Sequence, residues 1–374
     1  MRLNALVAAL LLTTSSSAFA QNLDALTDAL AHLPEVILTN PVPDQAYFVD
    51  TDVLRSLAGG ELNPRSGLRM LVGAALRPIE AIHMGNMKNW EEKSGIAFDQ
   101  IRYFAGFGTA PDTVSLWGLA DAAAADDLLH ALTERDFVPV GSAGALGNGE
   151  PMAIDILNRD PSDPWRSMVG AASFATAKGN VVIQAARPEV LPMLVADKPD
   201  AASNPVVATA LSGLGQAVED GQIVQAMLIS PAFGLNAIDP ADFMVPQSGN
   251  LDEIRAGLEA SMDAGLTGIP PYLGGIIADV QLQTPAVALA LAYADCDTAE
   301  GAAQQVAQRW IQSMPDTAQG HITTATAAGT DGLCAAIVSI VGDSDDPSIN
   351  PIFNALFESY MRRQFTVLQI GHAP

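Results

Sequence analysis

The chain has 374 residues, of which 42 are acidic and 18 basic, so its formal charge is −24, and 49% of its residues are hydrophobic. That hydrophobic fraction is too high for a disordered chain. The negative charge argues against nucleic acid or an anionic membrane surface as a partner. The partner that we expect is an unknown small molecule or an envelope protein.

The first twenty residues have the pattern of a secretory signal peptide. Arg2 precedes an apolar run at residues 5–12, and small residues end in Ala18-Phe19-Ala20, so cleavage is expected before Gln21. No cysteine follows that point for lipid attachment, and no later run is long and uninterrupted enough to span a bilayer. We therefore expect a periplasmic or secreted protein, whose two cysteines are free to oxidise.

The first half predicts helices alternating with short strands. Residues 66–84 have apolar side chains at helical spacing and predict a core helix that Pro78 kinks. Residues 99–104 favour a short helix, although a strand at 101–107 also fits the pattern. The other expected elements are a helix at 23–33, a strand at 46–49, a helix at 50–57, a strand at 113–119, a helix at 121–135, strands at 137–140, 152–157, 171–177 and 181–186, and a helix at 189–195.

The second half opens with a helix that has a clear start signal. Asn204 is a suitable N-cap and Pro205 a suitable first helical residue, so a helix is expected at 205–218. A buried strand follows at 223–230, and the loop at 231–249 is more apolar than a simple connection needs. The remaining elements before residue 284 are a helix at 250–264, a segment rich in Gly and Pro at 265–275, and a strand at 276–282.

Residues 284–341 give the strongest fold argument. The apolar run at 286–294 predicts a strand buried on both faces, and Asp297 or Thr298 caps a helix with one apolar stripe. A weaker strand is expected at 322–327 and an apolar strand at 333–341. The helix stripe consists of Ala302, Val306, Trp310 and Met314.

The order strand, helix, strand, strand predicts how these strands pair. A right-handed crossover makes the first two strands parallel, and a turn makes the third antiparallel to the second. If the third strand also lies beside the first, Cys296 and Cys334 meet and form a structural disulfide. A helix at 349–363 and a strand at 365–370 would complete a ferredoxin-like βαββαβ unit.

The two halves run in a similar order, which favours an internal repeat. Residues 116–121 ahead of one Ala-rich helix resemble residues 289–295 ahead of another, and residues 46–50 resemble 226–230. Asp160, Asp163 and Pro164 resemble Asp343, Asp346 and Pro347. We therefore expect an α+β fold of two related units, at 21–200 and 201–374, each a mostly antiparallel sheet with helices on one face. A cleft between them would be the default ligand site.

Few residues qualify as a functional site, because no nucleophile elbow, phosphate loop, complete dinucleotide fingerprint or helical zinc spacing is present. Trp165 in a polar loop is either a ligand platform or a plug packed on the core, and Phe233 and Phe243 pose the same question. No cofactor is expected, with calcium as the alternative. Asp343, Asp345 and Asp346 place oxygens at alternating loop positions, as a calcium site does, but glycine and the bidentate glutamate of an EF-hand are missing.

These features favour an exported, non-enzymatic binding or scaffold protein. Any ligand is expected between the two units or under the loop at 231–249. Two alternatives stay open: an unfamiliar carboxylate enzyme that uses a divalent cation, and an envelope protein that acts by self-assembly.

Overall fold

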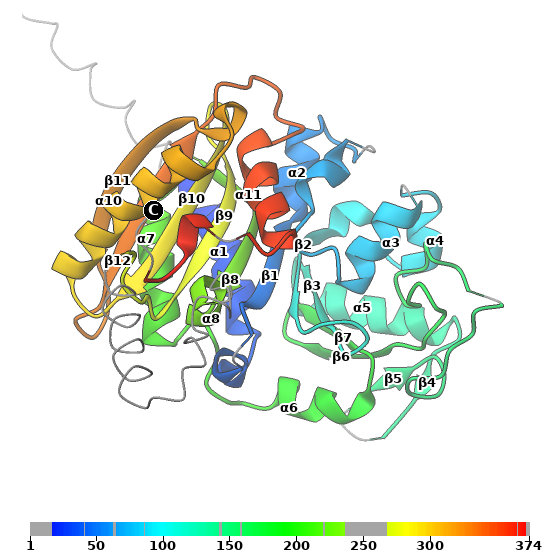
Figure 1. Cartoon of the computed structure of the whole chain (residues 1–374). Coiled ribbons are helices and arrows are strands. Elements are labelled where there is room, and N and C mark those ends of the chain that lie inside the picture. The colour runs from blue at the N-terminus through cyan, green and yellow to red at the C-terminus, as the bar shows by residue number, and fades with distance from the viewer. Residues whose placement is uncertain are drawn as a thin grey trace, which may run out of the picture.

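The computed structural model describes residues 17–40, 42–62, 65–85, 87–141, 144–157, 159–219, 221–235, 268–364 and 366–371. Their strands form one twelve-stranded sheet in which every neighbouring pair of strands is antiparallel (Figure 1). Helices pack on this sheet, so the fold is a mixture of α and antiparallel β structure, as the sequence predicts.

The bounds of the elements follow the chain. The strands are β1 (Asp44–Asp50), β2 (Ile101–Phe107), β3 (Val114–Leu119), β4 (Val138–Pro139), β5 (Leu146–Gly147), β6 (Phe174–Lys178), β7 (Val181–Ala185), β8 (Gln222–Ile229), β9 (Gly274–Gln281), β10 (Pro285–Tyr293), β11 (His321–Ala328) and β12 (Cys334–Val341). The α-helices are α1 (Ser17–Ala31), α2 (Thr51–Leu57), α3 (Arg77–Gly85), α4 (Trp90–Ser94), α5 (Ala122–Thr133), α6 (Leu191–Val195), α7 (Pro205–Ala217), α8 (Pro231–Leu235), α10 (Cys296–Ser313) and α11 (Pro351–Met361). The short 3₁₀ helices are η1 (Glu35–Thr39), η2 (Ser66–Arg69), η3 (Phe98–Gln100), η4 (Pro188–Val190), η6 (Asp316–Ala318) and η7 (Thr366–Leu368).

The centre of the sheet is the antiparallel pair of β1 and β8. Outward from β1 the strands are β2, β3, β7, β6, β5 and β4, and outward from β8 they are β9, β10, β12 and β11. On β1, Phe48 pairs with Ala105 of β2 and with Ala226 of β8. The first and second halves of the chain therefore meet through backbone hydrogen bonds in the middle of one sheet.

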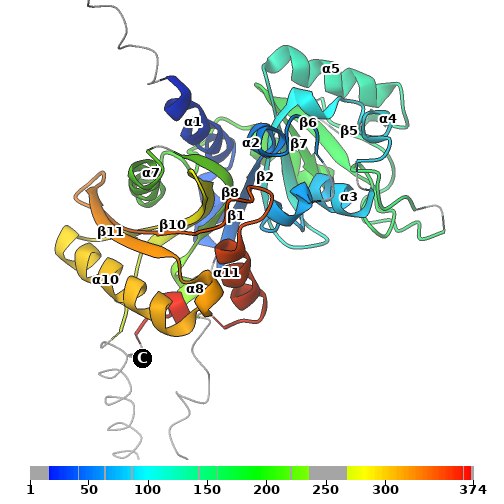
Figure 2. The ribbon, with the colours of Figure 1, turned by 90° about the horizontal axis from the view of Figure 1, so that it is seen from above.

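Helices cover both faces of the sheet, so the expectation of helices on one face is wrong (Figure 2). On β10 the large side chains Val287, Leu289 and Leu291 point to the layer that holds α10. The intervening alanines Ala286, Ala288 and Ala290 point to the layer that holds α7. Side chains that alternate across a strand need cover on both sides when both sets are apolar, which explains the second helical layer.

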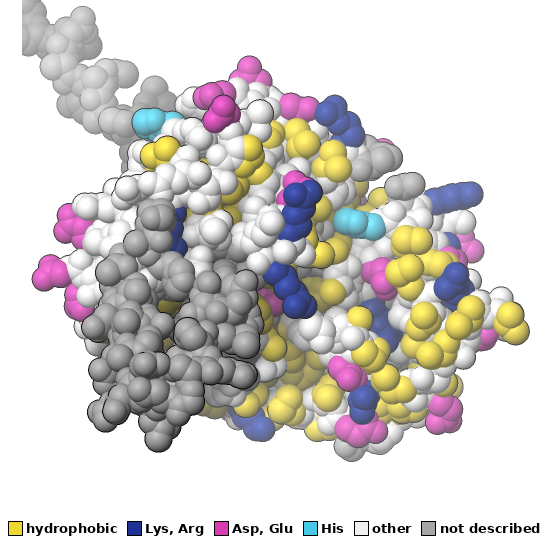
Figure 3. Space-filling view, viewed as in Figure 1, with side chains coloured by type: hydrophobic (Ala, Val, Ile, Leu, Met, Phe, Trp, Pro, Cys, Tyr) yellow, Lys and Arg dark blue, Asp and Glu magenta, His cyan; other side chains and the backbone are white. Residues whose placement is uncertain are grey.

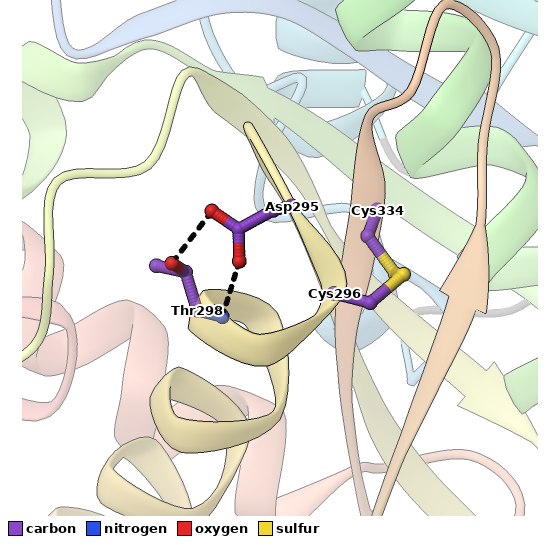
Figure 4. The surroundings of a disulfide bond; sticks show 4 residues. All are labelled: Asp295, Cys296, Thr298 and Cys334. Carbon is purple, nitrogen blue, oxygen red and sulfur yellow. Dashed lines mark hydrogen bonds between the residues drawn. A yellow bond between two sulfur atoms is a disulfide. The ribbon is translucent and has the colours of Figure 1, made fainter.

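The predicted order of strands around the disulfide is confirmed. β12 lies between β10 and β11 and is antiparallel to both, so β10 and β11 are parallel to each other. Tyr293 at the end of β10 pairs with Cys334 at the start of β12. Cys296 begins α10, and its disulfide to Cys334 spans a Cα–Cα distance of 5.0 Å (Figure 4). The N-cap of α10 is Asp295, whose carboxylate accepts a hydrogen bond from the Thr298 backbone nitrogen, so the prediction of Asp297 or Thr298 as the cap is wrong.

Several predicted elements differ from the structure, and the helix expected at 250–264 lies outside the described residues. Residues 365–370 contain η7 instead of a strand, and Ile370 makes only an isolated bridge with Ile269. Residues 152–157 are not a strand but an exposed irregular segment. Within 66–84 the α-helix begins only at Arg77, which satisfies the preference of Pro78 for the first turn of a helix. Residues 101–107 form β2, so the strand alternative there is correct.

Candidate ligand pocket

The pocket that we consider lies in the first half of the chain, beside the N-terminus of α3. Its volume is about 260 Å³. Its walls come from α3, the β2–β3 hairpin and two irregular segments, residues 152–154 and residues 167–171. The lining residues are Ala75, Arg77, Glu80, Ala110, Pro111, Thr113, Met152, Ile154, Ser167, Met168, Val169, Ala171 and Ala186. Predominantly apolar walls with a few polar groups are typical of small-molecule sites.

One wall consists of two chain segments that pack backbone to backbone. The Asp155 nitrogen donates a hydrogen bond of 3.2 Å to the Val169 carbonyl. Gly170 has a φ of 74°, and a Cβ on it would lie 2.4 Å from the Asp155 carbonyl oxygen. Only glycine fits that position, because a side chain would push the two segments apart.

The β2–β3 hairpin, which also lines the pocket, is held by an ion pair. Arg187, which follows β7, donates through Nε to Asp112 at 2.7 Å and through Nη2 at 3.3 Å. Two parallel hydrogen bonds fix the geometry of an arginine–carboxylate pair better than one does. Asp112 follows the lining residue Pro111, and Arg187 follows the lining residue Ala186. The ion pair therefore fixes Pro111 and Ala186 relative to each other.

Arg77 and Glu80 are the charged residues in the lining. Arg77 is 5% exposed, and its Nη1 donates to the Ala172 carbonyl at 2.7 Å and to Ser173 Oγ at 2.5 Å. Burial lowers the pKa of Arg77 to about 10, so the guanidinium is charged at neutral pH. Burial raises the pKa of the Glu80 carboxyl, against the lowering effect of a hydrogen bond from the Met168 backbone nitrogen.

Large apolar side chains are exposed around this pocket. Ile154 is 61% exposed, Ile156 58% and Leu157 95%, and Met168 and Val169 are also partly exposed. Figure 3 shows hydrophobic side chains gathered on this side of the molecule, in the region where β4 and β5 lie in Figure 1. A cluster of exposed apolar side chains next to a pocket is typical of a binding surface.

The aromatic residues singled out in the sequence lie elsewhere. Trp165 is fully buried, stacks on Trp117 at 4.6 Å between ring centroids, and donates from Nε1 to the Ser94 carbonyl at 2.7 Å. Phe233 is also buried and stacks on Tyr360. These positions match the interpretation of core plugs better than that of ligand platforms. Phe243 lies outside the described residues.

The three aspartates proposed for calcium lie between β12 and α11. Asp346 Oδ1 accepts hydrogen bonds from the Ser348 nitrogen at 3.0 Å and Ser348 Oγ at 2.6 Å, and its Oδ2 pairs with Arg65 at 2.7 Å. Those contacts hold the pKa of Asp346 below its usual value. Within the described ranges, no group of three or more His, Cys, Asp or Glu side chains is arranged to hold a metal ion.

A second buried arginine, Arg69, has its ion-pair partner within the core of the protein. Arg69 of η2 forms an ion pair with Asp279 of β9, and both side chains are almost fully buried. Gln281 accepts from Arg69, and Gln225 and Asn350 donate to Asp279. A buried ion pair whose remaining hydrogen-bonding groups are satisfied is a structural feature of a core.

Arg77 was missed as a site residue in the sequence. In the sequence it is only one of three charges, with Arg69 and Glu80, within the apolar stretch at residues 66–84. A charge inside an otherwise buried helix is the signal that could have identified it, because such a group needs a partner or a ligand. Its surroundings are set by β6 and by residues 167–172, which no local pattern connects to α3.

The chain matches no family model, no curated protein and no solved structure. In the part of the chain that the structure describes, no helix is both long enough and apolar enough to cross a membrane. The disulfide is compatible with an oxidising compartment such as the periplasm or the extracellular space.

Proposed function

We propose that this protein is an exported, non-enzymatic binding protein that holds a small, mainly apolar molecule in the pocket beside α3. The observation that carries the proposal is the pocket itself, with its apolar walls and buried arginine. Its volume of about 260 Å³ is close to the lower end of the range for ligand sites, roughly 300–1,000 Å³. The disulfide and the expected signal peptide support a periplasmic or secreted location.

Binding of a neutral fluorescent probe such as Nile red tests this proposal. Val169→Trp adds a large side chain in the pocket wall, whereas Ile311→Trp makes a comparable change at an exposed position on α10. We expect the unmodified protein and Ile311→Trp to bind the probe with equal affinity, and Val169→Trp to bind at least tenfold more weakly. Equal binding by both variants would rule this pocket out.

Native mass spectrometry gives a second, independent test. Protein purified from its own envelope should carry a retained small molecule, and Val169→Trp purified in the same way should not. If several preparations show no retained small molecule and the protein does not bind Nile red, the proposal is contradicted.

We also infer that the fold arose from two related units, residues 21–200 and 201–374. The order β1, β2, β3, β7, β6 outward from the centre has its counterpart in β8, β9, β10, β12, β11. Asp121 caps α5 after β3 as Asp295 caps α10 after β10. In contrast, Asp160 lies before β6 and Asp346 after β12, so that sequence match does not support the inference.

Self-assembly is the second candidate function, and β11 is the observation that favours it. β11 is the last strand on one side of the sheet, is eight residues long and has several exposed residues. It contains no Lys, Arg, Asp, Glu or Pro, the residues that usually prevent edge-to-edge pairing. Thr324→Lys should then convert an oligomer to a monomer in size-exclusion chromatography; a monomer before substitution would exclude this function.

A further inference from the structure

Arg77 is a buried cation without an acidic partner. No carboxylate of the described residues lies within ion-pair distance of its guanidinium, and its hydrogen bonds to the described chain all come from Nη1. Glu80 influences Arg77 only through longer-range attraction, while Arg166 adds a repulsive positive charge. A buried charge is costly unless an opposite charge or several hydrogen bonds compensate for it.

Two other buried arginines differ from Arg77 in their surroundings. Arg69 has Asp279 as its counter-ion. Arg309, like Arg77, has no acidic partner among the described residues and donates from Nη1 to two oxygens, the carbonyls of Thr366 and Gln369, in the turn that contains η7. Of these three arginines, only Arg77 lines the apolar pocket. Its position therefore indicates a ligand rather than an internal partner.

We propose that Arg77 is the anion-recognition residue of the pocket and that the ligand is a monocarboxylate with an apolar body. This proposal rests on the proposed function, since it specifies the ligand of the same site. Nη1 is fixed by the Ala172 carbonyl and Ser173 Oγ, which orients the planar guanidinium. A guanidinium presents its donors in a rigid fork that matches the two oxygens of a carboxylate.

The charges around the pocket argue against a second negative charge on the ligand. Glu80 is also part of the lining, so a dianionic phosphate would face one arginine and one carboxyl. The rest of the wall is mainly alanine, methionine, isoleucine and valine, which cannot solvate a second charge. The same side chains can cover an alkyl chain, and the flexible Met152 and Met168 can adapt to its length.

Displacement of Nile red by ligands that differ only in their head group tests the proposal. Decanoate, 1-decanol and decyl phosphate share one chain and have one, no and up to two negative charges. We expect decanoate to displace the probe at a concentration at least tenfold lower than either of the others. Equal displacement by decanoate and decanol would overturn the role of the anion, and stronger displacement by decyl phosphate would overturn the monocarboxylate.

Variants of Arg77 assign the effect to this residue. Arg77→Gln should weaken decanoate binding roughly tenfold to a hundredfold and change decanol binding by less than twofold. Arg362→Gln removes a positive charge from an exposed ion pair at the C-terminus of α11 and should change neither. Unchanged decanoate binding by Arg77→Gln would overturn the proposal.

Two controls distinguish failure of the carboxylate proposal from failure of the proposed binding function. If Arg77→Gln does not fold, Arg77→Lys keeps the charge without the fork, and it should bind decanoate more weakly than the unmodified protein but more tightly than decanol. Equal decanoate affinity in Arg77→Lys and the unmodified protein would contradict recognition by the fork. If Val169→Trp abolishes Nile red binding but the protein shows no preference for decanoate, the proposed binding function is supported. In that case only the proposal of a carboxylate ligand is contradicted.

Discussion

Asp50 is a carboxyl group buried at the start of α2, where its Oδ1 accepts a hydrogen bond from the Val53 nitrogen. Burial raises its pKa from 3.8 to about 7, although that hydrogen bond acts in the opposite direction. The native state therefore holds a proton between pH 4 and 7 that the unfolded chain has released. The contribution of Asp50 to stability is fully present below about pH 4 and is lost as the pH rises through 7.

We expect Asp50→Asn to remove this pH dependence, because asparagine can also accept the hydrogen bond at an N-cap. At pH 8 the variant should be more stable than the unmodified protein by on the order of 1–3 kcal/mol, and near pH 4 the two should be nearly equal. Urea unfolding at several pH values measures the difference. Parallel curves for the two proteins across pH 4–8 would contradict the prediction.

We also predict that Asp346 does not bind calcium. Both of its carboxylate oxygens already have partners, Ser348 on one side and Arg65 on the other. We therefore expect millimolar calcium to leave the melting temperature unchanged, since a ligand that binds the native state would raise it. A rise with calcium that Asp346→Asn abolishes would show instead that the loop binds the ion.

At the scale of single residues, sequence reasoning identified the disulfide but not Arg77. Cys296 and Cys334 were predictable because they lie at the ends of apolar runs whose pairing follows from the chain order. The charge of Arg77 within an apolar stretch was a signal in the sequence, but its partners were not predictable, because Ala172 and Ser173 lie about 95 residues away. Trp165 was a reasonable candidate by composition, but a polar loop does not reveal that its tryptophan reaches Trp117.

Helix α7 packs closely on the sheet because both contact surfaces carry small residues. A Cβ on Gly213 would lie 2.6 Å from the Ala335 Cβ and 3.3 Å from Ile337. Gly301 of α10, in contrast, has no neighbouring heavy atom within 4 Å of the same position. These two glycines therefore form a matched pair, since each lies within a helix and only one is confined.

We expect Gly213→Ala to lower the free energy of unfolding by about 1–3 kcal/mol, because the added methyl group forces α7 away from the sheet. Gly301→Ala should raise it by roughly 0.5–1 kcal/mol, because alanine has the higher helix propensity. Thermal or urea unfolding of both variants measures the two effects. The same sign for both substitutions would show that close packing is not the reason for Gly213.

At the scale of elements, sequence reasoning succeeded where the hydrophobic pattern is long and regular. β10, α10 and β12 lie close to their predicted positions because the apolar runs of the strands are long and the helix has one apolar stripe, although its N-cap is Asp295 and not Asp297 or Thr298. The prediction of a strand at residues 152–157 failed because an apolar run predicts burial, whereas this run is exposed beside a pocket. The strand expected at 365–370 failed because Arg309 holds the carbonyls of that segment in a turn.

At the scale of the whole molecule, the continuity of the sheet joins the two halves. The pairing of β1 with β8 could not be predicted, because apolar strands buried on both faces do not specify their partners. Apolar residues of α1, β2, β7, α7 and β9 belong to one cluster on the same face of the sheet. This shared core indicates that neither half unfolds without disturbing the other.

We therefore expect that removal of the disulfide destabilises both halves together. Cys296→Ser with Cys334→Ser opens a cross-link between residues 38 apart and should cost about 2–4 kcal/mol. In a Trp310→Phe background, all remaining tryptophans (Trp90, Trp117 and Trp165) lie in the first half, so their fluorescence reports on the half without the disulfide. Trp310→Phe with the disulfide intact is the control.

The transition monitored by these tryptophans should shift to lower urea by the same amount as the loss of secondary structure. This outcome follows from a single cooperative unit, because all parts of such a unit unfold at one midpoint. Two separate midpoints, with tryptophan fluorescence unaffected by the cysteine substitutions, would show that the halves unfold independently. In that case the β1–β8 pair would be a contact between two stable domains rather than the centre of one.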